Sequence, residues 1–142
     1  MTLSSLLYVS HSTIPSTDAE TVVQQIIAHA IANNADSGLT GALLFTGTHF
    51  AQVLEGEQAS IDRLMGALRR DPRHDQLLII TQGAVEKRRF RNFLMAYNGP
   101  SQFVARHVTR LMNNPSPADH RRAADWLTEL LHEFATNQGM KT

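Results

Sequence analysis

The sequence contains no cysteine among its 142 residues. This absence excludes disulfide bonds, thiolate catalysis and thiolate metal sites. It also excludes a covalent adduct between a bound ligand and a protein thiol. A chain without cysteine is typical of the reducing cytosol, so we expect a cytoplasmic protein.

Neither sign of charge is in excess, because 13 lysine and arginine residues balance 13 aspartate and glutamate residues. The chain therefore lacks the basic surface typical of proteins that bind nucleic acid or anionic membranes, and we expect neither as a direct partner. One local basic cluster, Lys87–Arg91, is interpreted as a solvated turn between two strands.

Long apolar runs and glycine-rich phosphate loops are also missing. No segment is apolar for long enough to span a bilayer, and the first residues do not resemble a signal peptide. The lack of a phosphate loop removes the usual argument for nucleotide hydrolysis. His107, His120 and His132 lack ligand spacing and a carboxylate partner, so we expect no metal site.

The apolar pattern of the first hundred residues indicates an α+β fold. Strands are predicted over residues 5–10, 39–45, 49–54, 77–81 and 90–97. The first helix begins at a capping box formed by Thr17 and Glu20 and ends near Asn34, and the second covers about residues 61–68. This order predicts a ferredoxin-like mixed five-stranded sheet with both helices on one face.

Two further helices are predicted after Gly99 and Pro100. The first covers residues 102–112, and the second, strongly amphipathic, extends from about Ser116 to Phe134. They most simply cover the face of the sheet that the first two helices leave bare. We therefore expect a domain at residues 1–98 and a C-terminal helical extension at residues 99–142 that packs on the sheet.

Three polar side chains on separate elements form the candidate site. Strand alternation places Tyr8 and Gln52 on faces that, if both lie beneath the helices, bring the phenol to the amide. Asn34, at the end of the first helix, approaches the same place. A buried amide needs several hydrogen-bond partners, so Gln52 in an apolar strand indicates a specific contact. The predicted apolar walls are Ile27, Ile31, Leu39 and Phe50.

Each of these polar residues alone is better explained as an ordinary strand residue at a sheet edge or facing solvent. Their combination favours a flat heteroaromatic ligand whose edge alternates hydrogen-bond donors and acceptors. A flavin ring has such an edge, with two carbonyls, an imide NH and a ring nitrogen.

Short motifs around these residues occur in the order and spacing of a known family. They are Leu-Leu-Tyr-Val-Ser around Tyr8, Asn34 followed by Leu39-Thr40-Gly41, Phe-Ala-Gln-Val-Leu-Glu-Gly around Gln52, Asp71-Pro72-Arg73-His74, and Lys87-Arg88-Arg89-Phe90 followed by Met95. Over about residues 3 to 98 the chain resembles the BLUF domain, a family of blue-light receptors that bind flavin, usually FAD. Its C-terminal helices resemble those of short BLUF proteins that lack a fused output enzyme.

The resemblance implies that residues 1–98 bind FAD, or FMN in its place, without a covalent bond. It also implies that Tyr8 supplies an electron and a proton to the excited flavin, with Gln52 as the bridge. Turning or tautomerising the Gln52 amide exchanges its donor and acceptor ends, so a flavin carbonyl can gain a hydrogen bond. One such bond is worth about 1 kcal/mol net, which predicts a small red shift that reverses thermally.

The chain departs from the family at several positions. Phe93 stands where many members have tryptophan. Side chains alternate between the two faces of a strand, so Phe93 and Met95, two residues apart, are expected on the same face. Met95 is therefore the better candidate to transmit the signal. Ala30 and Ile31 stand where the family often has serine and a polar or basic residue.

Other polar residues near the motifs have two interpretations each. His29 contacts the ligand or lies on the surface. Arg73 and His74 reach the pyrimidine side or the phosphates of the ligand, or they form a capping turn after the second helix. Glu55 and Glu57 are interpreted as residues at the start of a loop or helix rather than as a catalytic pair.

The resemblance implies a light sensor without catalytic turnover that signals through an unidentified protein partner and forms a homo-oligomer. Two alternatives stay open. An acylphosphatase-like small hydrolase shares the sheet topology, but it needs an arginine in a loop after the first strand, and residues 10–15 contain none. A flavin-free ferredoxin-like interaction module keeps only the fold. A yellow colour of the purified protein distinguishes the sensor from both.

Overall fold

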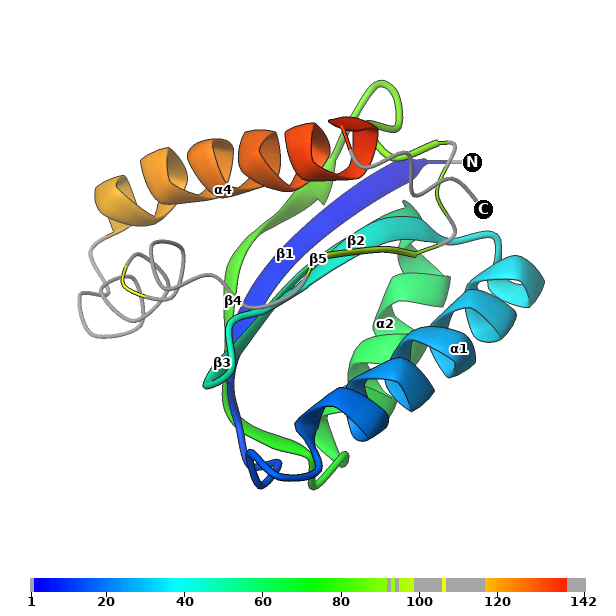
Figure 1. Ribbon diagram of the computed structural model, residues 1–142. Coiled ribbons are helices and arrows are strands. Elements are labelled where there is room, and N and C mark those ends of the chain that lie inside the picture. The colour runs from blue at the N-terminus through cyan, green and yellow to red at the C-terminus, as the bar shows by residue number, and fades with distance from the viewer. Residues whose placement is uncertain (1, 92, 94, 99–105, 107–116, 138–142) are drawn as a thin grey trace.

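The computed structural model describes residues 2–91, 93, 95–98, 106 and 117–137. Among these residues, five strands form one sheet in the order β4-β1-β3-β2-β5 (Figure 1). The first four pair antiparallel, and the short β5 lies parallel to β2. The strands are β1 (Leu3–Ser12), β2 (Thr40–Phe45), β3 (His49–Glu57), β4 (His74–Ala84) and β5 (Ala96–Asn98).

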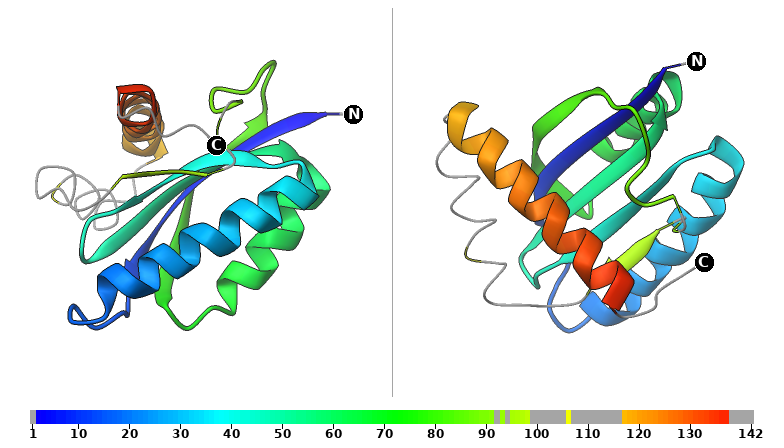
Figure 2. Two further views of the ribbon diagram at one scale, coloured as in Figure 1. Left: turned by 45° about the vertical axis from the view of Figure 1, so that its right-hand side comes forward. Right: turned by 90° about the horizontal axis from the view of Figure 1, so that it is seen from above.

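Helices lie on both faces of the sheet (Figures 1 and 2). α1 (Ala19–Ser37) and α2 (Gln58–Arg69) pack on one face, and α4 (Pro117–Asn137) packs on the other. The predicted α+β class is confirmed, as is the placement of the first two helices. Of the helix predicted at residues 102–112, the structure describes only residue 106, which is helical, and the rest lies outside the described residues. No helix of the described part is long and apolar enough to cross a bilayer.

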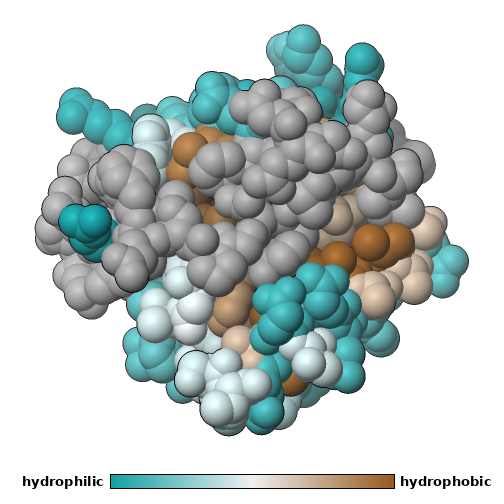
Figure 3. All heavy atoms as spheres, viewed as in Figure 1, coloured by the Kyte–Doolittle hydropathy of each residue, from teal (hydrophilic) through white to brown (hydrophobic). Residues whose placement is uncertain are grey.

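Each face of the sheet has its own apolar core, because side chains alternate along a strand. Leu6 and Tyr8 of β1 point to the side of α1 and α2, whereas Leu7 and Val9 point to the side of α4. In the view of Figure 3, hydrophilic and neutral side chains cover the lower part of the molecule, and hydrophobic ones show on its right-hand side. The apolar side chains of the two clusters lie between the sheet and the helices.

Several predicted boundaries are wrong by a few residues. α1 continues beyond Asn34 and ends at Ser37. The next residue, Gly38, has a φ of 70° and forms the left-handed C-cap that glycine adopts without strain. At the start of α1 the N-cap is Asp18, without a side-chain cap bond, so the predicted capping box at Thr17 is wrong. β3 extends to Glu57, past its predicted end at residue 54.

The strand predicted over residues 90–97 is wrong for most of its length, since only residues 96–98 pair with β2. β4 and β5 lie at opposite edges of the sheet, so the chain between them runs from one edge to the other. Residues 90, 91, 93 and 95 of this connection are not part of a strand, although the backbone oxygen of Phe93 accepts one hydrogen bond from Gly41 of β2. Phe93 packs in the core beneath α4, and Met95 lies in the core beneath α1 and α2. The predicted shared face of Phe93 and Met95 is therefore wrong, because the parity rule holds only along a regular strand.

Candidate functional site

A cavity of about 200 Å³ lies between the sheet and the two helices α1 and α2. Strands supply its base, the helices supply two walls, and the turn after α2 supplies the rim. The lining residues are Tyr8, Leu43, Phe50 and Gln52 from the strands, Ile26, His29, Ala30, Asn33 and Asn34 from α1, Leu64, Ala67 and Leu68 from α2, and Asp71, Arg73 and His74 from the turn and the start of β4.

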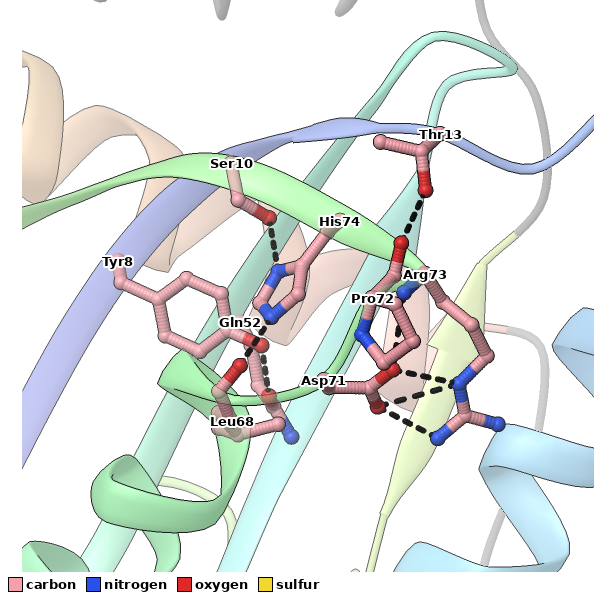
Figure 4. Close-up of polar contacts among 9 residues, drawn as sticks. All are labelled: Tyr8, Ser10, Thr13, Gln52, Leu68, Asp71, Pro72, Arg73 and His74. Carbon is pink, nitrogen blue, oxygen red and sulfur yellow. Dashed lines mark hydrogen bonds and ion pairs between the residues drawn. The ribbon is translucent and has the colours of Figure 1, made fainter.

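Tyr8 and Gln52 meet at the base of this cavity, as the strand pattern predicts. They are direct partners in the antiparallel pairing of β1 with β3. The Tyr8 hydroxyl donates a hydrogen bond of 2.5 Å to Oε1 of Gln52 (Figure 4). The other end of the amide, Nε2, donates to Sδ of Met95 at 3.7 Å. The orientation of the amide is therefore defined at both ends, with its oxygen toward the phenol and its nitrogen toward the sulfur.

Burial sets the protonation state of the phenol. The Tyr8 side chain is only 3% exposed. Burial raises the pKa of its hydroxyl well above the ordinary value of 10.0, and the nearby carboxylate of Asp71 raises it further. The phenol therefore keeps its proton throughout the neutral range and acts as a hydrogen-bond donor to Gln52.

The C-terminal end of α1 holds Asn34 at the cavity. The left-handed Gly38 turns the chain so that its N–H and the N–H of Leu39 both bond to the backbone oxygen of Asn34. These two hydrogen bonds to the same carbonyl oxygen fix the last turn of the helix. The Asn34 side chain is 1% exposed and lines the cavity, so a second amide lies in the same hollow as Gln52.

His74 faces the cavity, but its ring nitrogens bond to the protein. Nε2 lies 2.6 Å from the backbone oxygen of Leu68, and Nδ1 lies 2.7 Å from Oγ of Ser10 (Figure 4). Because a carbonyl oxygen only accepts, Nε2 carries a hydrogen and donates it. The ring also lies 6.1 Å from the ring of Tyr8, centroid to centroid. His74 thus ties the end of α2 to β1 beside the phenol.

Asp71 and Arg73 form an ion pair at the rim. Nη2 of Arg73 lies 2.6 Å from Oδ2 of Asp71, and Nε donates to both carboxylate oxygens. These hydrogen bonds hold the pKa of Asp71 below its usual value, against the opposing effect of partial burial. The Arg73 side chain is 41% exposed, so its guanidinium remains accessible from solvent.

The structure places the predicted wall residues differently. Phe50 lines the cavity, but Ile27, Ile31 and Leu39 pack in the surrounding apolar cluster without lining it. The helix stripe that faces the cavity instead contains Ile26 and Ala30, which are half-buried, whereas Ile27 is buried in the apolar cluster that α1 forms with the sheet. The exposed His29 lies at the opening.

Several lining residues were missed by the sequence pattern. Leu64 and Leu68 belong to the apolar face predicted for the second helix, and Asp71 belongs to the quoted Asp-Pro-Arg-His motif. Both features could have indicated them. Among the described residues, no group of three or more histidine, aspartate or glutamate side chains could hold a metal ion.

Comparison with known proteins agrees with this geometry. The model of the BLUF family, described as sensors of blue light using FAD, matches residues 3–96. The chain is 33% identical over 88 residues to the blue light- and temperature-regulated antirepressor BluF of Escherichia coli (strain K12), a match that covers 62% of this chain and 21% of the antirepressor. It is 28% identical over 90 residues to the photoactivated adenylate cyclase subunit beta of Euglena gracilis, covering 63% of this chain and 10% of the cyclase subunit.

These two relatives are much longer than the segment that matches, so the chain spans about a fifth and a tenth of their lengths. A solved structure of similar size also matches. The dark-state structure of the BLUF protein BlrB has a TM-score of 0.68 and 28% identity, and the match covers 87% of this chain and 97% of that one.

Proposed function

The chain belongs to the BLUF family of flavin-binding blue-light sensors, and we propose that it is a cytoplasmic photoreceptor without catalytic turnover that binds FAD beside Tyr8 and Gln52. The observation that carries this proposal is the hydrogen bond from the buried Tyr8 phenol to the Gln52 amide at the base of a cavity. FMN, which has the same ring, is the alternative ligand.

The residues around the cavity fit the ring of a flavin. Two primary amides, Gln52 and Asn34, supply both donors and acceptors for the polar edge of the ring, while Leu43 and Phe50 supply apolar surface. The accessible Arg73 guanidinium at the rim suits a phosphate of the ligand. His74, which bonds to Ser10 and Leu68, is proposed to contact the ligand through its ring and not through its nitrogens.

The proposed light response begins at the bond between Tyr8 and Gln52. When bound, the flavin supplies absorption of blue light and a strongly oxidising excited state. The phenol, held protonated by burial, has an electron to give and a proton already directed at Oε1 of Gln52. Loss of this electron and proton from Tyr8 allows the Gln52 amide to turn or tautomerise, and return of both to Tyr8 restores the phenol and leaves the amide in its new arrangement.

Rearrangement of the amide changes its contact with Met95. In the structure Nε2 of Gln52 donates to Sδ of Met95, and we propose this as the arrangement before light. A turned amide presents its oxygen to the sulfur, and two acceptors then face each other without a proton between them. Met95 must shift or lose this contact, and it directly precedes β5 in the chain. We therefore propose Met95, rather than Phe93 in the opposite core, as the residue that receives the change.

We propose that residues 1–98 sense light and that residues 99–142 carry the output to a protein partner. The two longer relatives are named as an antirepressor and a cyclase subunit, so this type of sensor occurs with different outputs. Trp126 on α4 is 37% exposed, and a large aromatic side chain on the surface suits a contact with a second copy of the chain. A homo-oligomer is therefore part of the proposal.

The absorption spectrum of the purified protein, recorded before and after blue light, tests this function. We expect a yellow protein with bound oxidised flavin and a small red shift that reverses in the dark. A colourless protein that takes up neither FAD, FMN nor riboflavin would contradict the proposal and favour an interaction module that keeps only the fold.

A further inference from the structure

The chain that connects β4 to β5 runs from one edge of the sheet to the other. On its way it is bonded to β3, the central strand of the sheet. It leaves one edge of the sheet at β4 and reaches the other edge at β5, passing the ends of β1, β3 and β2 (Figure 2). Phe90 and Phe93 of this connection pack in the core beneath α4, and Met95 packs in the opposite core. The connection is therefore in contact with both faces of the sheet within six residues, 90–95.

One buried carboxylate, that of Glu55, holds this connection. Glu55 lies on β3 between its cross-strand partners Ser5 of β1 and Thr40 of β2, and it is 2% exposed. Its Oε2 accepts the backbone N–H of Arg89 at 2.7 Å, and its Oε1 accepts the backbone N–H of Phe90 at 2.9 Å. Both carboxylate oxygens are thus used to bind two consecutive amides of the connection.

Polar neighbours of Glu55 extend the attachment to α1 and β2. The Thr40 hydroxyl donates to Oε1 of Glu55 at 3.1 Å and accepts from Nη1 of Arg88 at 3.0 Å. The same Nη1 donates to the backbone oxygen of Glu55, and Nη2 donates to the backbone oxygen of Gly38 at the end of α1. Arg88 therefore links the connection to the helix end that holds Asn34 at the cavity.

Two further contacts lead from the connection toward the site and toward α4. The backbone N–H of Gly41 in β2 donates to the backbone oxygen of Phe93 at 3.2 Å. The Arg89 side chain forms an ion pair with Glu129 of α4, and both side chains are about half-exposed. An exposed pair of this kind contributes little by itself. The buried carboxylate is the stronger attachment, because its bonds are charge-assisted and shielded from water.

We propose that Glu55 is a positioning residue of the light response, which fixes residues 88–93 so that a change at Met95 is transmitted to α4. The inference rests on the proposed light function. If residues 88–90 were loosely held, movement of Met95 would be absorbed by the connection. Held at Glu55, the connection moves as a unit, and its Phe93 packs against the core that Leu127 and Leu131 of α4 complete.

The substitution Glu55→Gln tests this role with almost no change in shape. A carboxamide presents one NH₂ group, so a donor faces the N–H of Arg89 or of Phe90 whichever way the amide turns. The matched control is Glu57→Gln, the same chemical change at an exposed position on the same strand. Amide hydrogen exchange is measured in the dark and under blue light in both variants and in the wild type.

We expect both variants to bind flavin and to form the red-shifted state, because Glu55 does not touch the cavity. In Glu55→Gln alone, dark-state protection of the Arg89 and Phe90 amides should fall, and the light-minus-dark difference across residues 117–137 should be lost. A full light-minus-dark difference there in Glu55→Gln, or its absence in the wild type despite a normal red shift, would overturn the inference.

A second variant covers the case in which Glu55→Gln does not fold. Thr40→Val removes a donor to Glu55 and the acceptor of Arg88 while it keeps the side-chain shape. It should reduce the light-minus-dark difference across α4 while the red shift persists, and a wild-type response in this variant would overturn the inference. A wild type that shows no red shift would instead refute the proposed function, and the dark-state exchange at residues 89 and 90 would still test the attachment.

Discussion

Replacing Tyr8 by phenylalanine separates the packing role of the ring from the chemistry of the hydroxyl. The ring fills the base of the cavity at 3% exposure and should continue to do so. The hydroxyl is the donor in the 2.5 Å bond to Gln52. We therefore expect Tyr8→Phe to bind flavin with near-normal affinity and to lose the red-shifted state, because the group that gives the electron and the proton is absent.

The stability cost of Tyr8→Phe follows from the same bond. A buried acceptor left without its donor costs about 1 to 3 kcal/mol, and removal of the buried hydroxyl itself offsets part of this loss. The net destabilisation should be about 1 to 2 kcal/mol, which lowers the thermal midpoint by about 3 to 8 °C. Absorption spectra under blue light and thermal unfolding of the flavin-bound protein measure the two effects.

The matched control for this variant is Tyr97→Phe, which makes the same change at the other tyrosine of the chain. It should leave the red shift in place. If Tyr8→Phe formed the red-shifted state with normal yield, the proposed role of the phenol would be refuted. A loss of stability above about 4 kcal/mol would show that the ring had not kept its place, and the argument from unchanged packing would fail.

Four further predictions concern the neighbours and the protonation of Tyr8. Gln52→Leu should retain flavin and lose the shifted state, and a normal shift in this variant would exclude the amide as the group that rearranges. Asn34→Ala should weaken flavin binding by about 1 to 3 kcal/mol, and an unchanged affinity on titration would contradict its placement beside the ligand. Met95→Ala should keep the red shift and reduce the light-dependent exchange difference over residues 93–134, so a full difference would exclude Met95 as the receiver. The raised pKa of Tyr8 means that, as pH rises, the unfolded wild type loses the phenol proton before the folded protein does. The wild type therefore loses stability above pH 10.0, whereas Tyr8→Phe has no such proton to lose. The difference in unfolding free energy between the two should be constant below pH 10.0 and shrink above it.

The sequence predicts the pair at the centre of the site because the rule behind it is rigid. Side chains alternate strictly along β1 and β3, so a correct antiparallel pairing of these strands brings Tyr8 to Gln52. Asn34 is predicted as well, since the glycine and the Leu-Thr-Gly segment that follow it mark the end of the helix. Once β1 pairs with β3, the alternation along each strand leaves the Tyr8 and Gln52 side chains no other face.

Other features depend on tertiary structure and were not predictable in this way. Phe93 and Met95 lie on opposite faces because the connection between β4 and β5 crosses the sheet irregularly, and parity has no meaning there. The choice of Ile26 over Ile27 as a wall residue depends on how α1 is rotated on the sheet. Glu55 was interpreted as a residue at a loop or helix start, because its partners at residues 89 and 90 are backbone N–H groups, which leave no mark in the sequence.

The most direct test of the central claim is the light-minus-dark infrared difference spectrum of the flavin-bound protein, compared with that of Gln52→Leu. If the Gln52 amide rearranges, a flavin carbonyl gains a hydrogen bond, and its stretching band moves to lower frequency under blue light in the wild type only. The band should return to its position in the dark together with the absorption spectrum. A carbonyl band that does not move in the wild type, or moves equally in Gln52→Leu, would contradict the account.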